Sequence, residues 1–390
     1  MAIEGTQTRG ADRRVRLGMV GGGQGAFIGA VHRIAARLDD QYVLLAGALS
    51  NDPERALASA AELGLAPSRA YSDFQAMASR ERRLKDGIEA VSIVTPNHMH
   101  FPVARAFLRA GIHVICDKPL VHKSSEARQL QKLATEKKLI FAVTYNYSGY
   151  PMIRQAREMV RSGTLGEVRV VQVEYPQDWL SEKLEDTGQK QAAWRTDPSR
   201  SGIGGCVGDI GTHAYHLVCF VTELEIEELC ADLTRFVPGR ALDDNVQILL
   251  RFRGGARGML WASQVAPGNE NALRLRVYGS MGGLEWRQED PNYLLHAPLG
   301  EPPRRITRGG SGSDAAAGRL TRVPPGHPEG YLEGFANIYG EVAEAIRARR
   351  LGDAVDADVT FPSVDDGAQG VAFIEAAVRS SERDAKWVKL

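Results

Sequence analysis

The fold is decided by the stretch MVGGGQGAFIG, residues 19–29, in a chain of 390 residues. An apolar run at residues 15–20 precedes it, and a helical pattern of apolar residues follows it up to Leu38. Gly21, Gly23 and Ala26 satisfy the pattern G-x-G-x-x-G/A, with either Ala26 or Gly29 in the third-glycine role. Glycines at these positions let a strand turn tightly into a helix and bring the backbone close to a pyrophosphate, which the helix N-terminus stabilises. The stretch therefore predicts dinucleotide binding.

Strand and helix signals alternate on both sides of this turn. Apolar runs lie at residues 15–20, 42–49, 90–94, 113–116 and 140–143, and helical patterns at 53–63, 103–110 and 124–137 lie between them. Near-continuous apolar strands alternating with helices are typical of a parallel sheet covered on both faces. We therefore predict an α/β fold whose N-terminal part, residues 15–145, is a doubly wound Rossmann domain. Residues 1–14 are polar and expected to be disordered.

The pattern changes after residue 145. Longer alternating strands are expected at 168–175, 229–236, 246–252, 257–264 and 273–278, with few helices between them. Residues 288–328 are rich in Gly, Pro, Ser and Arg and are read as one long irregular segment, before helices at 331–350 and 364–383. The expectation is an α+β domain, residues 146–390, that binds substrate through a large, mainly antiparallel sheet. One face of such a sheet needs cover, which predicts a homodimer or homotetramer unless residues 288–328 fold back over it.

Composition limits the partners. Lysines and arginines number 48 and acids 48, so the zero net charge predicts neither a nucleic-acid nor a membrane partner. The four cysteines lack the spacing of a zinc site, so no metal is expected. The N-terminus has no apolar core of a secretory signal, and no run is long enough to span a bilayer. These features favour a cytoplasmic protein that binds a small molecule.

The end of the second strand bears on which dinucleotide is bound. NAD-binding versions of the fold place an acid there to bind the ribose 2′-hydroxyl, but this chain has Ser50 and Asn51, followed by Asp52 and then Arg55. Ser50, Asn51 and Arg55 would suit a 2′-phosphate, whereas Asp52 could turn back to the ribose. The segment could also be simple turn and helix-cap chemistry. The cofactor is therefore NAD or NADP.

Three further motifs carry polar groups to the same edge of the sheet. Thr95-Pro96-Asn97-His98 ends the third strand, and Cys116-Asp117-Lys118-Pro119-Leu120 ends the fourth. Ligands of open α/β sheets bind at these strand ends. The segment GDIGTH, residues 208–213, puts Asp209 and His213 four residues apart, on one face if it is helical. Taken singly, these motifs also fit an exposed lysine, a helix N-terminal acid and a core histidine.

Together these motifs resemble the Gfo/Idh/MocA family of NAD(P)-dependent sugar and cyclitol dehydrogenases. The resemblance runs from residue 15 to the C-terminus and includes TPNHMH, DKPL, NYSGYP, GEVRVVQVEY, AWRTDP and GDIGTH. The chain departs from the family pattern in its elongated glycine turn, in Asp117 where Glu is commoner, in Ser50, and in Ser148 where an arginine is common. The stretch QDW, residues 177–179, is similar to an element of levoglucosan-dehydrogenase-like members and favours a pyranoside or anhydrosugar.

The resemblance implies roles for particular residues. The catalytic residues would be Lys118, Asp209 and His213. Contacts to the cofactor are expected from Gly21, Gly23, Gly25, Ala26, Phe27, Ile28, Ser50, Asn51, Arg55, Thr95, Pro96, Asn97, His100, Asp117, Lys118, Trp194 and Arg195. Contacts to the substrate are expected from Lys118, Tyr147, Gln177, Trp179, Asp209 and His213.

The expected reaction is hydride transfer between NAD(P) and a secondary hydroxyl carbon of a sugar, anhydrosugar, glycoside or cyclitol. His213 would take the hydroxyl proton, Asp209 would orient the imidazole or bind a neighbouring hydroxyl, and Lys118 would stabilise the alkoxide. Members of the family are argued to use either the lysine or the histidine as the proton acceptor, so that choice stays open. The alternatives are an NAD-dependent glycoside hydrolase and a non-catalytic sugar-binding protein, although binding alone does not need all three catalytic residues.

Overall fold

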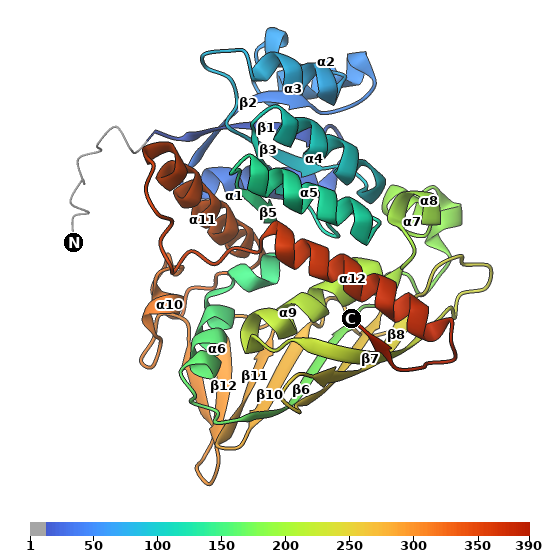
Figure 1. The fold of residues 1–390 in the computed structure, drawn as a ribbon, viewed down its shortest axis with the longest axis vertical. Coiled ribbons are helices and arrows are strands. Elements are labelled where there is room, and N and C mark those ends of the chain that lie inside the picture. Colours follow the sequence, from blue (N-terminus) through green and yellow to red (C-terminus); the bar gives the residue numbers. More distant parts are fainter. Residues whose placement is uncertain (1–12) are drawn as a thin grey trace.

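The computed structural model describes residues 13–390, in two layers that each contain one sheet (Figure 1). The predicted disorder of residues 1–14 falls almost wholly on residues 1–12, which lie outside the described range.

The first sheet is parallel throughout, with strand order β2-β1-β3-β4-β5. Its strands are β1 (Val15–Gly21), β2 (Tyr42–Ala48), β3 (Ala90–Val94), β4 (His113–Cys116) and β5 (Phe141–Val143). Helices α1 (Phe27–Leu38), α2 (Pro53–Glu62), α3 (Phe74–Glu81), α4 (His100–Arg109) and α5 (Ser124–Glu136) connect them. Every residue of β3 is buried, as expected of a strand covered on both faces. The strand order reverses between β1 and β3, and this doubly wound arrangement confirms the predicted fold class.

The second sheet has nine strands in the order β13-β12-β11-β10-β6-β9-β8-β7-β14. They are β6 (Val168–Pro176), β7 (Ile226–Thr234), β8 (Asn245–Phe252), β9 (Arg257–Ser263), β10 (Arg274–Gly279), β11 (Gly282–Arg287), β12 (Tyr293–Pro298), β13 (Arg304–Thr307) and β14 (Val388–Lys389). Only the pair β6 and β9 is parallel, so the prediction of a large, mainly antiparallel sheet is confirmed.

The prediction that residues 288–328 form one long irregular segment is wrong. The segment contains β12, β13 and the short helix α10 (Ala315–Gly318). Its Gly and Pro residues mark the turns between these elements. Leu294 and His296 point inward from β12, while Arg308 is buried and paired with Glu329 at 2.8 Å. This part of the chain therefore packs into the main core of the second layer, and a buried ion pair fixes its end.

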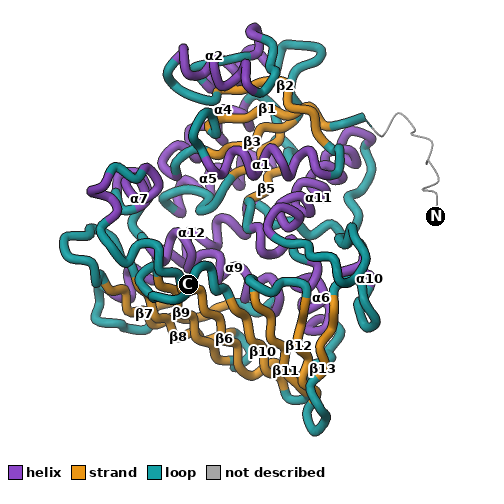
Figure 2. Tube along the Cα trace, turned by 180° about the vertical axis from the view of Figure 1, so that it is seen from behind, coloured by secondary structure: helices purple, strands orange, loops and turns teal. Residues whose placement is uncertain are grey.

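Helices cover one face of the large sheet. They are α6 (Pro151–Arg161), α9 (Thr212–Thr222) and α12 (Val364–Ser381), and Figures 1 and 2 show them between the two sheets. Neither α6 nor α9 was predicted. Ten of the eleven residues of α9 are buried, so the helix is enclosed on all sides and lacks the one-sided periodicity that identifies a surface helix. The opposite face of the sheet exposes Val170, Leu249 and Met259.

Helix α11 (Tyr331–Leu351) returns to the first sheet and packs along α1. The hydroxyl of Tyr339 in α11 is hydrogen-bonded at 2.8 Å both to Nδ1 of His32 in α1 and to the hydroxyl of Ser92 in β3. The division of the chain at residue 145 stays a prediction. The strands of the first sheet all precede residue 145 and those of the second all follow it, whereas α11 packs on the N-terminal layer. Across residues 13–390, no helix combines the length and the apolar character needed to cross a bilayer.

Candidate active site

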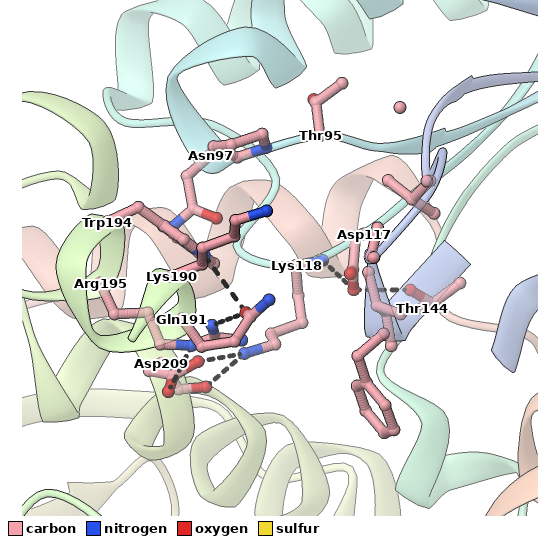
Figure 3. A pocket seen from close by; sticks show the side chains of 18 of the residues that line it. Thr95, Asn97, Asp117, Lys118, Thr144, Lys190, Gln191, Trp194, Arg195 and Asp209 are labelled. Carbon is pink, nitrogen blue, oxygen red and sulfur yellow. Dashed lines mark hydrogen bonds and ion pairs between the residues drawn. The ribbon is translucent and has the colours of Figure 1, made fainter. Parts of the chain in front are cut away.

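A cleft of about 950 Å³ opens at the carboxyl ends of β1, β3 and β4 and is closed from the other side by residues of the second layer (Figure 3). Most of the predicted site residues line it. They are Gly21, Gly23, Gly25, Ala26, Phe27, Ile28, Ser50, Arg55, Thr95, Pro96, Asn97, Asp117, Lys118, Tyr147, Gln177, Trp179, Trp194, Arg195, Asp209 and His213. Two predicted cofactor residues, Asn51 and His100, are not part of its wall.

The glycine turn packs too closely against neighbouring backbone to carry side chains at several positions. Gly21 has a φ of +81°, which only glycine adopts without strain. A Cβ on Gly23 would lie 2.6 Å from the carbonyl oxygen of Leu49, and a Cβ on Gly29 would lie 2.4 Å from the Cα of Gly22. Gly29, rather than Ala26, therefore allows the close helix–strand approach. Ala26 precedes α1, whose first turn has no side-chain cap, so its N–H groups suit the pyrophosphate of a dinucleotide.

The residues after β2 differ in whether their side chains are free to contact the ribose of the cofactor. Asp52 caps α2, because its carboxylate accepts a hydrogen bond of 2.8 Å from the backbone N–H of Arg55. The guanidinium of Arg55 donates at 2.8 Å to the carbonyl oxygen of Gln24, which places it beside the glycine turn. Cap chemistry thus accounts for Asp52, while Ser50 and Arg55 face the cleft. Asn51, which is also predicted to contact the cofactor, lies in the exposed turn before α2 and does not line the cleft.

His100, which is predicted to contact the cofactor, does not line the cleft. The imidazole is fully buried, with Nδ1 at 2.8 Å from the carbonyl oxygen of Pro119 and Nε2 at 3.0 Å from that of Thr95. His100 therefore links the loops after β3 and β4 from behind the wall of the cleft. It positions Thr95 and Lys118 rather than a ligand.

A charged cluster joins the two layers. Lys118 follows β4, and its Nζ lies 2.9 Å from Oδ1 of Asp209, which stands on the π-helical turn η6 (Val207–Gly211). The other oxygen, Oδ2, accepts from Arg195 at 3.2 Å and from Gln264 at 2.8 Å. Burial by itself would raise the pKa of Asp209, but the charges of Lys118 and Arg195 hold this pKa below its usual range. Asp209 is therefore a carboxylate at neutral pH.

His213 lies in the same cleft but is not bonded to Asp209, contrary to one of the two expected roles of that carboxylate. Within residues 13–390, its buried Nδ1 has no hydrogen-bond partner. The rings of Tyr147 and Tyr145 pack against the imidazole in T-shaped arrangements, with ring centroids 4.9 and 5.7 Å from its own. Burial, and then the charge of Lys118, hold the pKa of His213 well below its ordinary value of 6.5. The imidazole is therefore neutral and able to accept a proton.

A hydrogen-bonded chain of side chains forms the far end of the cleft. Trp179 donates to Gln177 at 3.1 Å, and Gln177 and Tyr175 each donate at 2.7 Å to Oδ1 of Asn271. The hydroxyl of Tyr175 is also hydrogen-bonded to that of Tyr147. Three of the five members were predicted. Asn271 was missed because it lies in the loop between β9 and β10, where no local pattern marks it.

Helix α7 (Lys190–Arg195) borders the cleft opposite the glycine turn. The indole of Trp194 donates to Gln191 at 3.2 Å, and the guanidinium of Arg195 stacks 4.3 Å from the centre of the Trp194 ring and bonds Gln191 as well. Lys190 and Gln191 were not predicted as site residues. Helical spacing could have identified Gln191, because residues three and four apart share a helix face.

Comparisons with known proteins identify relatives of this chain. Residues 15–145 match the family model described as "Oxidoreductase family, NAD-binding Rossmann fold", and residues 153–285 match the "GFO/IDH/MocA C-terminal domain". The crystal structure of an oxidoreductase from Sinorhizobium meliloti is 58% identical, covers 97% of this chain and 100% of that chain, and has a TM-score of 0.88.

Two further solved structures contain ligands. An inositol dehydrogenase homolog from Azotobacter vinelandii, complexed with NADH and myo-inositol, is 38% identical, with 97% and 98% of the two chains covered and a TM-score of 0.91. Levoglucosan dehydrogenase, in complex with NADH and levoglucosan, is 26% identical, with 97% and 99% covered and a TM-score of 0.82.

Proposed function

Because the chain belongs to the Gfo/Idh/MocA family of oxidoreductases, we propose that it transfers hydride between NAD(P) and a secondary hydroxyl carbon of a sugar, anhydrosugar, glycoside or cyclitol. The predicted resemblance is thus confirmed, as is the presence of an NAD-binding Rossmann fold. One observation carries the proposal. The Lys118–Asp209 pair and the neutral imidazole of His213 share a cleft with the glycine turn.

The cofactor would lie along the carboxyl edge of the first sheet. The glycine turn and the first turn of α1 would hold its pyrophosphate, and Asp117 and Thr144, which are hydrogen-bonded to each other at 3.1 Å, would face its nicotinamide end. When bound, the nicotinamide supplies the hydride acceptor. The protein must orient the substrate carbon and remove one proton.

His213 is the proposed proton acceptor. Its pKa lies well below 6.5, so the imidazole is unprotonated at neutral pH and free to take the hydroxyl proton. Lys118 would donate a hydrogen bond to the same oxygen and stabilise the negative charge that develops there. Asp209 holds the ammonium in place at 2.9 Å, so Asp209 acts on the reaction through Lys118 rather than by orienting His213.

The substrate end of the cleft fits a polyol ring. Amide and phenol groups of Gln177, Asn271 and Tyr147 can donate and accept hydrogen bonds, and Trp179 adds an aromatic face for C–H surfaces. The ligands of the two relatives, myo-inositol and levoglucosan, are neutral hydroxylated rings. They are therefore the first compounds to test.

A screen of sugars, anhydrosugars and cyclitols with NAD+ and NADP+, read by the absorbance of the reduced nicotinamide, tests the proposal. We expect substrate-dependent formation of reduced cofactor with at least one polyol. A protein that releases an aglycone from a glycoside without net reduced cofactor would be a hydrolase and would overturn it. A protein that binds a sugar but never reduces the cofactor would overturn it as well.

A further inference from the structure

Two cations face the cleft from the second layer without a counter-charge. Lys190 is the first residue of α7, and Arg200 lies on the short helix α8 (Pro198–Ser201). Both side chains are exposed and both line the cleft. Figure 3 shows Lys190 extending from α7 into the cleft. For the part of the chain from residue 13 onward, neither forms an ion pair within 4.0 Å.

Five other charged residues of the cleft are engaged in ion pairs or hydrogen bonds. Lys118 and Arg195 share the carboxylate of Asp209. Asp117 accepts hydrogen bonds from the backbone N–H of Lys118 and from Thr144. Arg55 is bonded to the glycine turn itself.

The carboxylate nearest to Arg200 in the sequence is also engaged. Asp197 accepts hydrogen bonds of 2.9 and 2.7 Å from the backbone N–H and the hydroxyl of Ser199, and so caps α8. Among the described residues, Lys190 and Arg200 are therefore the cations of the cleft whose side chains form neither an ion pair nor a hydrogen bond.

The position of α8 indicates which anion. Asn97, in the loop after β3, donates a buried hydrogen bond of 3.0 Å to the carbonyl oxygen of Ser201, the last residue of α8. This bond holds α8 at the carboxyl end of β3. The strand order reverses between β1 and β3, and a dinucleotide crosses the sheet at that point with its pyrophosphate against the turn after β1.

Helix α7 is fixed on the same side. The side chain of Gln189 caps it by accepting at 2.7 Å from the backbone N–H of Ala192, and Arg195 ties its end to Asp209. Lys190 therefore projects from an anchored turn rather than from a free loop. The glycine turn opposite offers N–H groups and a helix dipole, but its side chains between Gly21 and Ile28 carry no positive charge.

We propose that Lys190 and Arg200 form the second half of the pyrophosphate site, so that the cofactor is held by both layers of the protein. This inference rests on the proposed function, since it takes NAD(P) as the ligand. Each phosphate of the bridge carries one negative charge, and each cation would form a charge-assisted hydrogen bond with it. Release of the cofactor would then require the segment of residues 189–201 to move away from the first layer.

Titration of the cofactor-free protein with NADH, followed by nicotinamide fluorescence, tests this without catalysis. Lys190→Ala and Arg200→Ala should each raise the Kd by about tenfold, the effect of one charged hydrogen bond, and the double variant by about a hundredfold. Lys190→Arg should retain most of the affinity. Lys183→Ala is the matched control, because Lys183 lies on the same segment but is paired with Asp186 at 3.0 Å and does not line the cleft.

Competition with nucleotide fragments identifies the contact. The variants should lose affinity for ADP, which contains the pyrophosphate, and keep their affinity for adenosine, which does not. Alanine variants that bind NADH within twofold of wild type would overturn the inference while leaving the proposed function intact. Equal losses for ADP and adenosine would indicate a structural role and would also overturn it. A wild type that binds neither NADH nor NADPH would instead refute the proposed function, and this inference with it.

Discussion

Lys118 donates to two oxygens of Asp209, at 2.9 Å to the carboxylate and 2.5 Å to the backbone carbonyl, although the residues belong to different layers of the molecule. Lys118 follows a parallel strand of the first layer, and Asp209 stands on a π-helical turn of the second. The reacting groups are therefore assembled only when the two layers are correctly packed.

Removal of this lysine should affect turnover more than nucleotide affinity. In Lys118→Ala, we expect kcat to fall by roughly a hundredfold or more, because a charge that stabilises the developing alkoxide is lost. The Kd for NADH should stay within a few-fold of wild type. Steady-state kinetics and NADH titration measure both quantities, and a kcat within tenfold of wild type would remove Lys118 from the catalytic residues.

The pH profile of kcat/KM should identify the proton acceptor. The pKa of His213 is held well below 6.5, so its basic form predominates above and somewhat below that pH. If His213 is the base, kcat/KM should persist as the pH falls through 6.5 and decline only in more acidic solution. If kcat/KM instead falls on acidification with a midpoint above neutral pH, and His213→Asn shows the same fall, Lys118 is the base.

The polar residues after β2 should permit NADP to compete with NAD. Ser50 faces the cleft where a carboxylate would repel a 2′-phosphate, and the guanidinium of Arg55 lies beside the glycine turn. Ser50→Asp should therefore shift the ratio of kcat/KM values towards NAD, whereas the uncharged control Ser50→Asn should not. Strong rejection of NADP by the wild type would mean that another group reads the ribose.

The uncovered face of the large sheet predicts self-association. Leu249 and Met259 are 50% and 46% exposed on that face. Helix α10 lies beside α6 on the opposite, helix-covered side, so residues 288–328 do not fold back over the exposed strands. A homodimer or homotetramer that packs these faces together would bury them.

Light scattering at micromolar concentration measures this directly. A mass that is a multiple of 42.5 kDa would support the prediction, and a mass near 42.5 kDa would contradict it. Leu249→Glu should dissociate the oligomer. Leu299→Glu, at an exposed position in a hairpin, should leave it intact.

Much of the first layer could be predicted from sequence because its signals are local. Each strand of the parallel sheet is a short apolar run that ends in Gly, Pro or a polar residue, and the glycine turn fixes where the sequence of strands begins. The motifs DKPL and GDIGTH also predicted that Lys118 and Asp209 share a site, and the two side chains are hydrogen-bonded in the structure.

The features that were missed depend on contacts between distant segments. Asn271 belongs to the site only because Tyr175 and Gln177 reach it from another strand. Likewise, His100 lies in the sequence where a cofactor-binding residue is expected, but both of its ring nitrogens are hydrogen-bonded to backbone carbonyl oxygens. No pattern within either segment carries that information.

Isotope transfer tests the central claim, hydride transfer from a polyol carbon, most directly. The polyol that reacts in the screen would be prepared with deuterium at its carbinol carbons and incubated with NAD+ or NADP+ and the protein. We predict that the reduced nicotinamide carries one deuterium at its ring carbon, as measured by mass spectrometry, and that the organic product is a ketone. Reduced cofactor without deuterium, or a cleaved glycoside with no net reduced cofactor, would contradict the account.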